Sequence, residues 1–240
     1  MGTARFKVRQ AIVLFRHGDR SPTINCMEPH VQAAAQEAAG WAKLLPTSEF
    51  QKNLSEAIPI CSEHDVQRDA RLGIFGSMTQ YGVYQMFMLG RVLAGRYFRG
   101  ELLQANAPNG KEIATFSSNF RRTQLSAQSV LLGIFPKYRF STNRAQQNRL
   151  VVNVSSTGDD YLNVWGTNPR LRKLLKDILI GQSNSNHVDF EAIESASPDI
   201  QKTKRAVLNT IPAFQFFISP FLWMTVLDHF RCRLARACAR

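Results

Sequence analysis

The sequence predicts an α/β fold in which helices cover a parallel sheet, followed by a mainly helical region. In the first part of the chain, apolar runs of strand length alternate with longer segments of helical periodicity, a pattern typical of such a sheet. Beyond about residue 137 the strand pattern fades. With 240 residues, 44% of them hydrophobic, the chain can bury the core of one large domain or of two small ones.

The first predicted elements are a strand and two helices. Residues 11–15 form a continuous apolar run, which is typical of a strand buried on both faces. The alanine-rich residues 31–45 predict a short helix, and residues 59–76 follow it as a loop region. Residues 77–98 have the apolar spacing of an amphipathic helix, and Thr79 is placed to cap its N-terminus.

The later elements continue this alternation and then become helical. Residues 112–119 predict a second strand. Residues 121–136 predict the end of that strand, a turn and a helix, which the proline closing this segment stops. Residues 168–181 and 190–217 both have helical patterns. The chain is therefore expected to start as an α/β domain and to continue as helices.

The charge of the chain favours anionic partners. It carries 30 basic and 18 acidic side chains, a formal net charge of +12, which suits phosphate esters, nucleic acid or acidic lipid. The basic residues are dispersed rather than interleaved with aromatic residues, so no nucleic-acid partner is expected. Residues 211–227 are the most apolar segment, but two prolines interrupt it and it is marginally short for a membrane span. We expect a buried helix or helix pair there, the alternative being a membrane-associated interaction protein.

The cysteines give no sign of a metal site. Neither a CxxC pair nor a set of cysteines and histidines with zinc spacing occurs among Cys26, Cys61, Cys232 and Cys238. Disulfides among them require an oxidising compartment, so their state stays open. The first ten residues contain no apolar leader region. This favours a cytoplasmic chain, with a secretory or lysosomal-type location as the alternative if a leader is missing.

Concentrated charge follows the first predicted strand. Arg16, His17 and Arg20 lie within five residues, and ligands of open α/β sheets bind beyond the carboxyl ends of strands. Gly18 allows a sharp turn there, and Pro22 cannot continue a strand. The forked N–H donors of an arginine guanidinium match the oxygens of a phosphate group. A neutral imidazole can attack phosphorus through one nitrogen while a hydrogen bond holds the other. The segment predicts an anion-binding loop that contains a histidine nucleophile.

A second pair of arginines follows the second predicted strand. Arg121 and Arg122 are expected just before a helix, with Thr123 near its N-terminus. If the two strands are neighbours, Arg122 can join Arg16 and Arg20 around one tetrahedral anion. Arg121 is interpreted as an ordinary loop arginine.

Three segments together resemble a known family. "RHGDRSP" resembles the RHGxRxP signature of the histidine acid phosphatases, within the histidine phosphatase superfamily. Residues 78–97 are similar to the family's LTxxGxxQxxxLGxxLRxRY helix, and residues 117–136 to its RTxxSAxxxLxGLFP segment. The three occur in the family's order and cover the chain to about residue 136, which makes the match specific. The RxP extension favours the acid phosphatase branch over the mutase-like branch.

The resemblance implies a fold and a reaction. The fold would be a phosphoglycerate-mutase-like three-layer sandwich, with residues 1–136 as the core, an insertion at about 23–77, and 137–240 as part of a helical cap. The sheet is expected to be incomplete. The reaction would be hydrolysis of a small phosphomonoester through a phosphohistidine on His17, without metal or cofactor. The resemblance assigns substrate binding to Arg16, Arg20 and Arg122.

One element of the family pattern is missing from the sequence. The family carries a later HD motif whose aspartate protonates the leaving group, a contribution of about a hundredfold to ten-thousandfold in rate. The pair His64-Asp65 precedes the helix motif and is expected to be a surface loop pair, and Asp228-His229 has the reverse order and resembles part of the cap. We therefore assign no general acid and expect the chain to end within the cap. The alternative function is a catalytically impaired fragment or pseudophosphatase that binds phosphate or phosphoesters without turnover.

Overall fold

The computed structural model contains two compact units. The first consists of residues 1–20, 46–69 and 78–156, and the second of residues 21–45, 70–77 and 157–240. The structure describes residues 8–28, 30–62, 73–99, 102, 112–136, 150–156, 159–180, 189–211, 214–215 and 221–237. The pair His64-Asp65 and Cys238 lie outside these residues.

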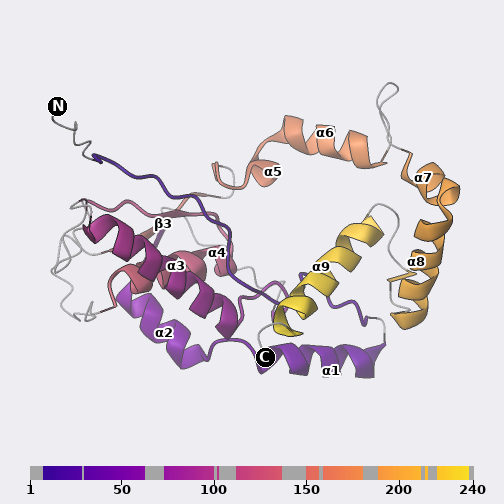
Figure 1. Ribbon diagram of the computed structural model, residues 1–240, viewed down its shortest axis with the longest axis horizontal. Helices are drawn as coiled ribbons and strands as arrows, with labels where there is room; N and C mark the ends of the chain where they lie inside the picture. The colour runs from indigo at the N-terminus through magenta and orange to yellow at the C-terminus, as the bar shows by residue number, and fades with distance from the viewer. Residues whose placement is uncertain are drawn as a thin grey trace, which may run out of the picture. The chain divides into compact units, whose positions relative to one another are not determined.

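The described strands of the first unit form a parallel sheet, which confirms the α/β class. Its three strands, in the order β1-β3-β2, are β1 (Ile60–Ser62), β2 (Phe116–Ser117) and β3 (Val152–Val154). Ile60 is paired with Val152, and Ser117 with Val154. The helices of this unit are α2 (Ser48–Ala57), α3 (Gln80–Arg99) and α4 (Arg121–Ile134), labelled in Figure 1.

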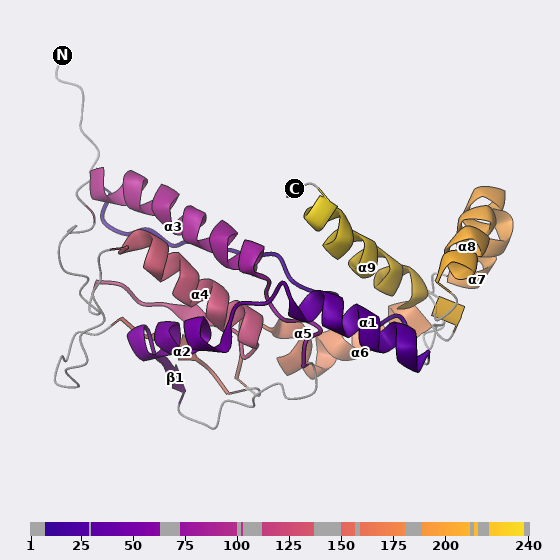
Figure 2. The same cartoon turned by 90° about the horizontal axis from the view of Figure 1, so that it is seen from below.

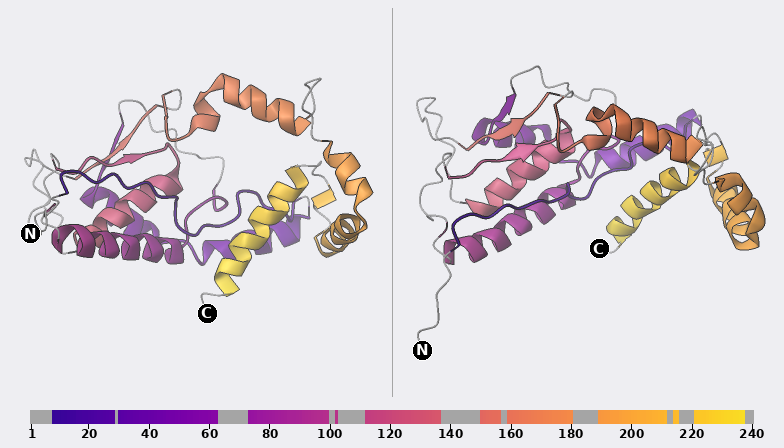
Figure 3. Two further views of the ribbon diagram at one scale, coloured as in Figure 1. Left: turned by 45° about the horizontal axis from the view of Figure 1, so that its top comes forward. Right: turned by 90° about the horizontal axis from the view of Figure 1, so that it is seen from above.

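Helix α4 is central to the first unit. It lies between the strands and α3, as Figures 2 and 3 show from different sides. Its apolar side chains pack with those of α2 and β3 in one buried cluster, made of Leu54, Ala57, Ile58, Ala127, Leu131, Phe135, Leu150, Val152 and Val154. Burial of these side chains is what holds α4 to the sheet, at about 25 cal/mol per Å² of apolar surface.

Helices α3 and α4 approach each other at a pair of glycines. A Cβ added to Gly90 would lie 2.2 Å from the carbonyl oxygen of Val130, and one added to Gly133 would lie 2.0 Å from the carbonyl oxygen of Phe87. No side chain fits at such distances, so both positions require glycine. The close contact fixes α3 against α4 and, as described below, the two helices hold the same loop.

The structure corrects the prediction of a first buried strand. Within the described part of the chain, residues 11–15 belong to no strand, and they follow an extended path on the surface (Figure 3). Ile12 is 80% exposed and Leu14 is 84% exposed. The prediction of burial was wrong because an apolar run gives only the types of its residues. It does not show whether other elements cover them. A strand also needs a neighbour that takes its backbone N–H and C=O groups.

Two strands appear where none was predicted. β1 lies inside residues 59–76, which were expected to be loop, and β3 lies beyond residue 137, where the strand pattern fades. Each is three residues long. A run this short has too few residues for an alternating pattern to be read, and its identity as a strand comes from pairing alone.

In its described residues, the second unit contains helices and no strand. Its helices are α1 (Val31–Ala42), α5 (Val164–Thr167), α6 (Pro169–Ile180), α7 (Phe190–Ala196), α8 (Pro198–Thr210) and α9 (Phe221–Ala237). The N-caps of α7 and α8 are Asp189 and Ser197, whose side chains accept from backbone N–H groups of the first turn. A buried cluster of this unit contains Cys26, Ile211, Phe214, Leu222 and Val226.

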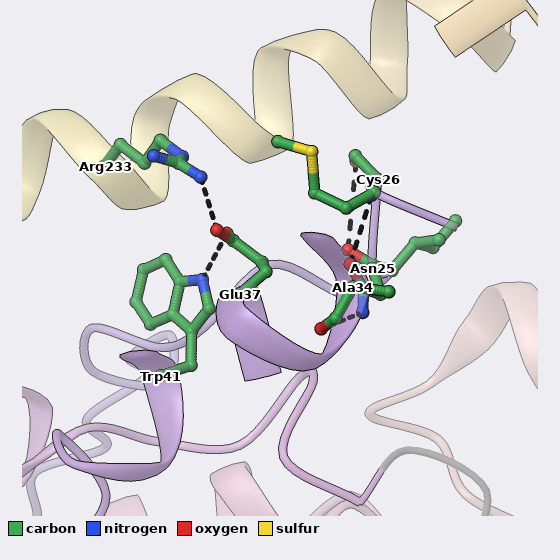
Figure 4. Close-up of polar contacts among 8 residues, drawn as sticks. Asn25, Cys26, Ala34, Glu37, Trp41 and Arg233 are labelled. Carbon is green, nitrogen blue, oxygen red and sulfur yellow. Dashed lines mark hydrogen bonds and ion pairs between the residues drawn. The ribbon is translucent and has the colours of Figure 1, made fainter. Parts of the chain in front are cut away.

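A partly buried polar contact joins α1 to α9 in this unit. The Glu37 carboxylate accepts from Nε1 of Trp41 at 2.7 Å and from Nη2 of Arg233 at 2.6 Å (Figure 4). Such charge-assisted bonds fix direction as well as distance. Among the described helices, none has the length and apolar character needed to cross a membrane.

Candidate active site

The predicted nucleophile loop, residues 16–20, lies against the first turn of α3. Thr79 donates its backbone N–H to the carbonyl oxygen of Asp19 at 3.0 Å, and Arg20 pairs with Met78 in an antiparallel bridge. Arg16 is exposed, His17 is half-buried and Arg20 is buried. The short pairing therefore sets the path of the loop just after the histidine.

Side chains at the start of helix α3 also make hydrogen bonds to the loop. Thr79 is the N-cap of α3, since its Oγ1 accepts from the backbone N–H of Gly82 at 3.1 Å. The same hydroxyl donates to Oδ2 of Asp19 at 2.6 Å. Oε1 of Gln85 accepts from the backbone N–H of Asp19 at 2.8 Å. Thr79, Gly82 and Gln85 are three residues apart, so they share the helix face that meets the loop.

Two glycines allow the loop to lie directly on the helix. A Cβ on Gly82 would lie 2.1 Å from the carbonyl oxygen of Asp19, and a Cβ on Gly18 would lie 2.4 Å from the carbonyl oxygen of Gly82. These are backbone-to-backbone approaches, which no side-chain movement can relieve. Gly18 thus serves a close approach as well as the sharp turn expected from the sequence.

Helix α4 holds the loop from a second side. The backbone N–H of Gly18 donates to Oγ of Ser126 at 3.2 Å, and the Ser126 hydroxyl donates to the carbonyl oxygen of Arg122 at 2.7 Å. The Arg122 guanidinium lies 4.4 Å from the centre of the Phe120 ring, a cation–π contact. The loop and the first turns of α4 are therefore joined through one serine.

The arginine pair lies inside α4 rather than before it. The helix begins at Arg121, so the expectation of a turn ahead of the helix was wrong by one or two residues. Arg121 is exposed and Arg122 is half-buried. Positive charge in the first turn opposes the helix dipole, which costs stability unless an anion is near. Helix stability therefore does not account for the arginines at these two positions.

One nitrogen of the His17 ring makes a hydrogen bond within the loop. Its Nδ1 lies 2.8 Å from the carbonyl oxygen of Gly18, and because a carbonyl only accepts, Nδ1 carries the proton and donates. The other nitrogen, Nε2, then carries the lone pair. This is the tautomer that a nucleophilic imidazole needs.

The surroundings keep this ring neutral. Burial is the largest cause that lowers the pKa of His17, from 6.5 to about 4, and the positive charges of Arg122, Arg20 and Arg16 lower it further. The hydrogen bond to Gly18 acts in the opposite direction. All three arginines predicted for the site therefore lie close enough to act on the predicted nucleophile. At neutral pH the imidazole is unprotonated.

The pair Asp228-His229 in α9 makes contacts that hold the fold of the second unit. Oδ2 of Asp228 accepts from the backbone N–H of Thr23 at 2.9 Å and from its hydroxyl at 3.0 Å. His229 is 1% exposed, and its ring meets the rings of Phe214 and Phe230 edge-on. Burial lowers the pKa of His229. Asp228 anchors the chain beyond the loop, and His229 is part of the core of the second unit.

Sequence reasoning missed two residues of the loop's supports. Gln85 and Ser126 both lie inside the segments that resemble the family, but no chemical role followed from their types. The signal for Gln85 was its spacing of three from Gly82, which places it on the face of the predicted N-cap. Ser126 gave no comparable signal. In the part of the chain that the structure describes, no group of three metal-ligating side chains occurs.

Comparisons with known proteins agree with this arrangement. The family model described as "Histidine phosphatase superfamily (branch 2)" matches residues 7–197. The chain is 27% identical over 168 residues to the testicular acid phosphatase of Homo sapiens, a match that spans 69% of this chain and 31% of the relative. The family predicted from the three motifs is confirmed, and the chain belongs to branch 2 of the histidine phosphatase superfamily.

Proposed function

We propose that this chain is an acid phosphatase-like hydrolase that transfers the phosphoryl group of a small phosphomonoester to Nε2 of His17. The observation that carries the proposal is the state of the His17 ring. Its Nδ1 is held by the Gly18 carbonyl, and it is neutral and close to three arginines. A neutral imidazole with a free lone pair inside a cationic loop is suited to attack a phosphate dianion.

The reaction has two steps. In the first, the Nε2 lone pair forms a bond to phosphorus while the bond from phosphorus to the ester oxygen breaks, and the leaving oxygen takes up a proton from solvent where its basicity requires one. In the second, water attacks phosphorus and releases a proton to solvent, the N–P bond breaks with its electron pair returning to Nε2, and inorganic phosphate leaves. Arg16, Arg20 and Arg122 would hold the phosphoryl oxygens and stabilise the charge that develops on them.

Two candidate functions differ in whether the chain supplies a group that protonates the leaving oxygen. The carboxyl group nearest to His17 in the sequence is that of Asp19. The carboxylate of Asp19 accepts from Thr79 at the N-terminus of α3. This favours, as a second candidate, a protein that binds phosphate or phosphoesters and does not turn them over.

Leaving-group dependence tests the two candidates. The purified chain is assayed with p-nitrophenyl phosphate, whose leaving group needs no protonation, and with an alkyl phosphate, whose leaving group does. Turnover of the aryl ester alone supports His17 chemistry without a placed acid, and turnover of both supports a complete phosphatase. Binding of vanadate without any turnover supports the second candidate.

A nucleophile variant completes the test. His17→Ala is expected to lower the turnover of p-nitrophenyl phosphate by about a thousandfold or more, since loss of a nucleophile removes the covalent path. A phosphohistidine signal in ³¹P NMR should disappear with it. If His17→Ala retains full activity, the proposed reaction is wrong.

A further inference from the structure

A chain of hydrogen bonds leads from α3 to the His17 ring. The carbonyl of Gly18 and the N–H of Asp19 belong to the same peptide unit. On one side, the Asp19 N–H donates to Oε1 of Gln85 at 2.8 Å. On the other side, the Gly18 carbonyl accepts from Nδ1 of His17 at 2.8 Å. Gln85 and the nucleophile are therefore joined through a single rigid peptide.

The planarity of that peptide makes the connection directional. Since the six atoms of a peptide unit stay close to one plane, fixing the N–H also fixes the direction of the C=O. A hydrogen bond at one end polarises the group, which strengthens the bond at the other end. Gln85 thus acts on the acceptor that decides which His17 nitrogen carries the proton.

Asp19 adds a second restraint to the loop, at its side chain and at the carbonyl of the following peptide. Its carbonyl accepts from the N–H of Thr79, and its carboxylate accepts from the Thr79 hydroxyl, which also caps α3. The first turn of α3 contains no acidic residue. The Asp19 carboxylate supplies the negative charge that a helix N-terminus favours, so the loop and helix stabilise each other.

We propose that Gln85 is a positioning residue for His17, and that it sets the tautomer and the orientation of the nucleophile through the Gly18–Asp19 peptide. This role rests on the proposed function for its catalytic consequence, but the tautomer itself is independent of turnover. Gln85 lies on α3 and does not need to contact the substrate. Its removal should therefore affect the chemical step more than substrate binding.

The test combines NMR and kinetics on the full chain. Long-range ¹H–¹⁵N spectra of the His17 ring report which nitrogen carries the proton. In the wild type we expect the proton on Nδ1, and in Gln85→Leu a substantial population with the proton on Nε2. In single-turnover assays with p-nitrophenyl phosphate, Gln85→Leu should lower the rate of phosphoryl transfer by about tenfold, the effect of one hydrogen bond, with a smaller change in KM.

Two further variants separate positioning from stability. Gln85→Glu keeps an acceptor oxygen and should restore the Nδ1–H tautomer. Gln128→Leu removes a buried amide of α4 that donates to the carbonyl of Ile58 at 2.7 Å, and it should lower stability while leaving the His17 spectrum unchanged. The proposal is overturned if the wild-type ring carries its proton on Nε2, or if Gln85→Leu leaves the tautomer as it is. A wild type without turnover but with the expected tautomer shift overturns the proposed function alone.

Discussion

Residues 8–15 and residues 17–20 are neighbours in the chain but have opposite surroundings. In the described part of the chain, the first segment is extended, exposed and without backbone hydrogen bonds. In the second, Gly18 and Asp19 are bonded to side chains of α3 and α4, and Arg20 is paired with Met78. The segment with the stronger apolar signal is the less restrained of the two.

The difference shows how the nucleophile is positioned. The loop does not depend on residues 11–15 being a buried strand. It depends on glycines that allow contact and on polar side chains that hold individual peptide groups. Substitutions that disturb the contacts of the loop with α3 or α4 should therefore lower stability or anion binding. Substitutions in the apolar run should change neither.

The largest effect is expected from Gly82→Ala. The added Cβ would lie 2.1 Å from the Asp19 carbonyl oxygen, so the loop or the helix must move. We expect a loss of about 3 kcal/mol in the free energy of unfolding, measured with urea, and a loss of vanadate binding. The matched control is Gly95→Ala in the same helix, where a Cβ meets nothing within 4 Å. That change should stabilise the chain by up to about 1 kcal/mol, and equal losses for both variants would contradict the contact.

A second large effect is expected from Arg122→Ala. The Arg122 charge acts on His17, and its loss should weaken vanadate or phosphate binding by about a hundredfold, within the range for charge-assisted bonds to a buried anion. Isothermal titration calorimetry measures this affinity. Arg121→Ala is the control, because Arg121 is exposed and adjacent on the same helix. Equal losses would show that the two arginines share the role.

A change of pH is expected to have an intermediate effect on phosphohistidine formation and on stability. Since the pKa of His17 is lowered to about 4, phosphohistidine formation should be independent of pH near neutrality and fall as pH drops through about 4. The folded chain binds this proton less tightly than the unfolded chain does. Stability should therefore decrease as pH falls from 6.5 toward 4. Urea unfolding at several pH values measures this dependence.

A variant assigns that dependence to the loop. His17→Gln should flatten part of the stability change between pH 6.5 and 4, and the remainder is expected from His229, whose pKa is also lowered. An unchanged pH profile in His17→Gln would show that the ring is not shielded from solvent in the folded chain.

The smallest effect is expected from Leu14→Ser. Leu14 is 84% exposed, so its replacement should change the free energy of unfolding by less than about 0.5 kcal/mol and should improve solubility. Leu131→Ala is the contrast, since Leu131 is 2% exposed in the core and its truncation should cost about 2–5 kcal/mol. A large loss for Leu14→Ser would mean that the run is buried in solution and that the comparison fails.

Local patterns predicted part of the fold. The helices α1, α3, α4, α6 and α8 lie where periodicity placed them, and Thr79 caps α3 as expected. Helix periodicity repeats within a few residues, so the pattern can be read from one segment. β1 and β3 escaped prediction because each is defined by a partner far away in the chain, and the run at residues 11–15 was misassigned for the same reason.

By itself, the sequence determined which chemical groups the site can use and which family the chain belongs to. Arg16, His17 and Arg20 are neighbours in the chain, so their proximity follows from covalent geometry. Only the tertiary structure decided how the nucleophile is held, because the acceptor for Asp19 comes from Gln85, 66 residues away. The Ser126 hydroxyl that accepts from Gly18 comes from a position 108 residues away. Hydrogen bonds between peptide groups and distant side chains depend on distance and angle in space, and only the packing of α3 on α4 supplies these.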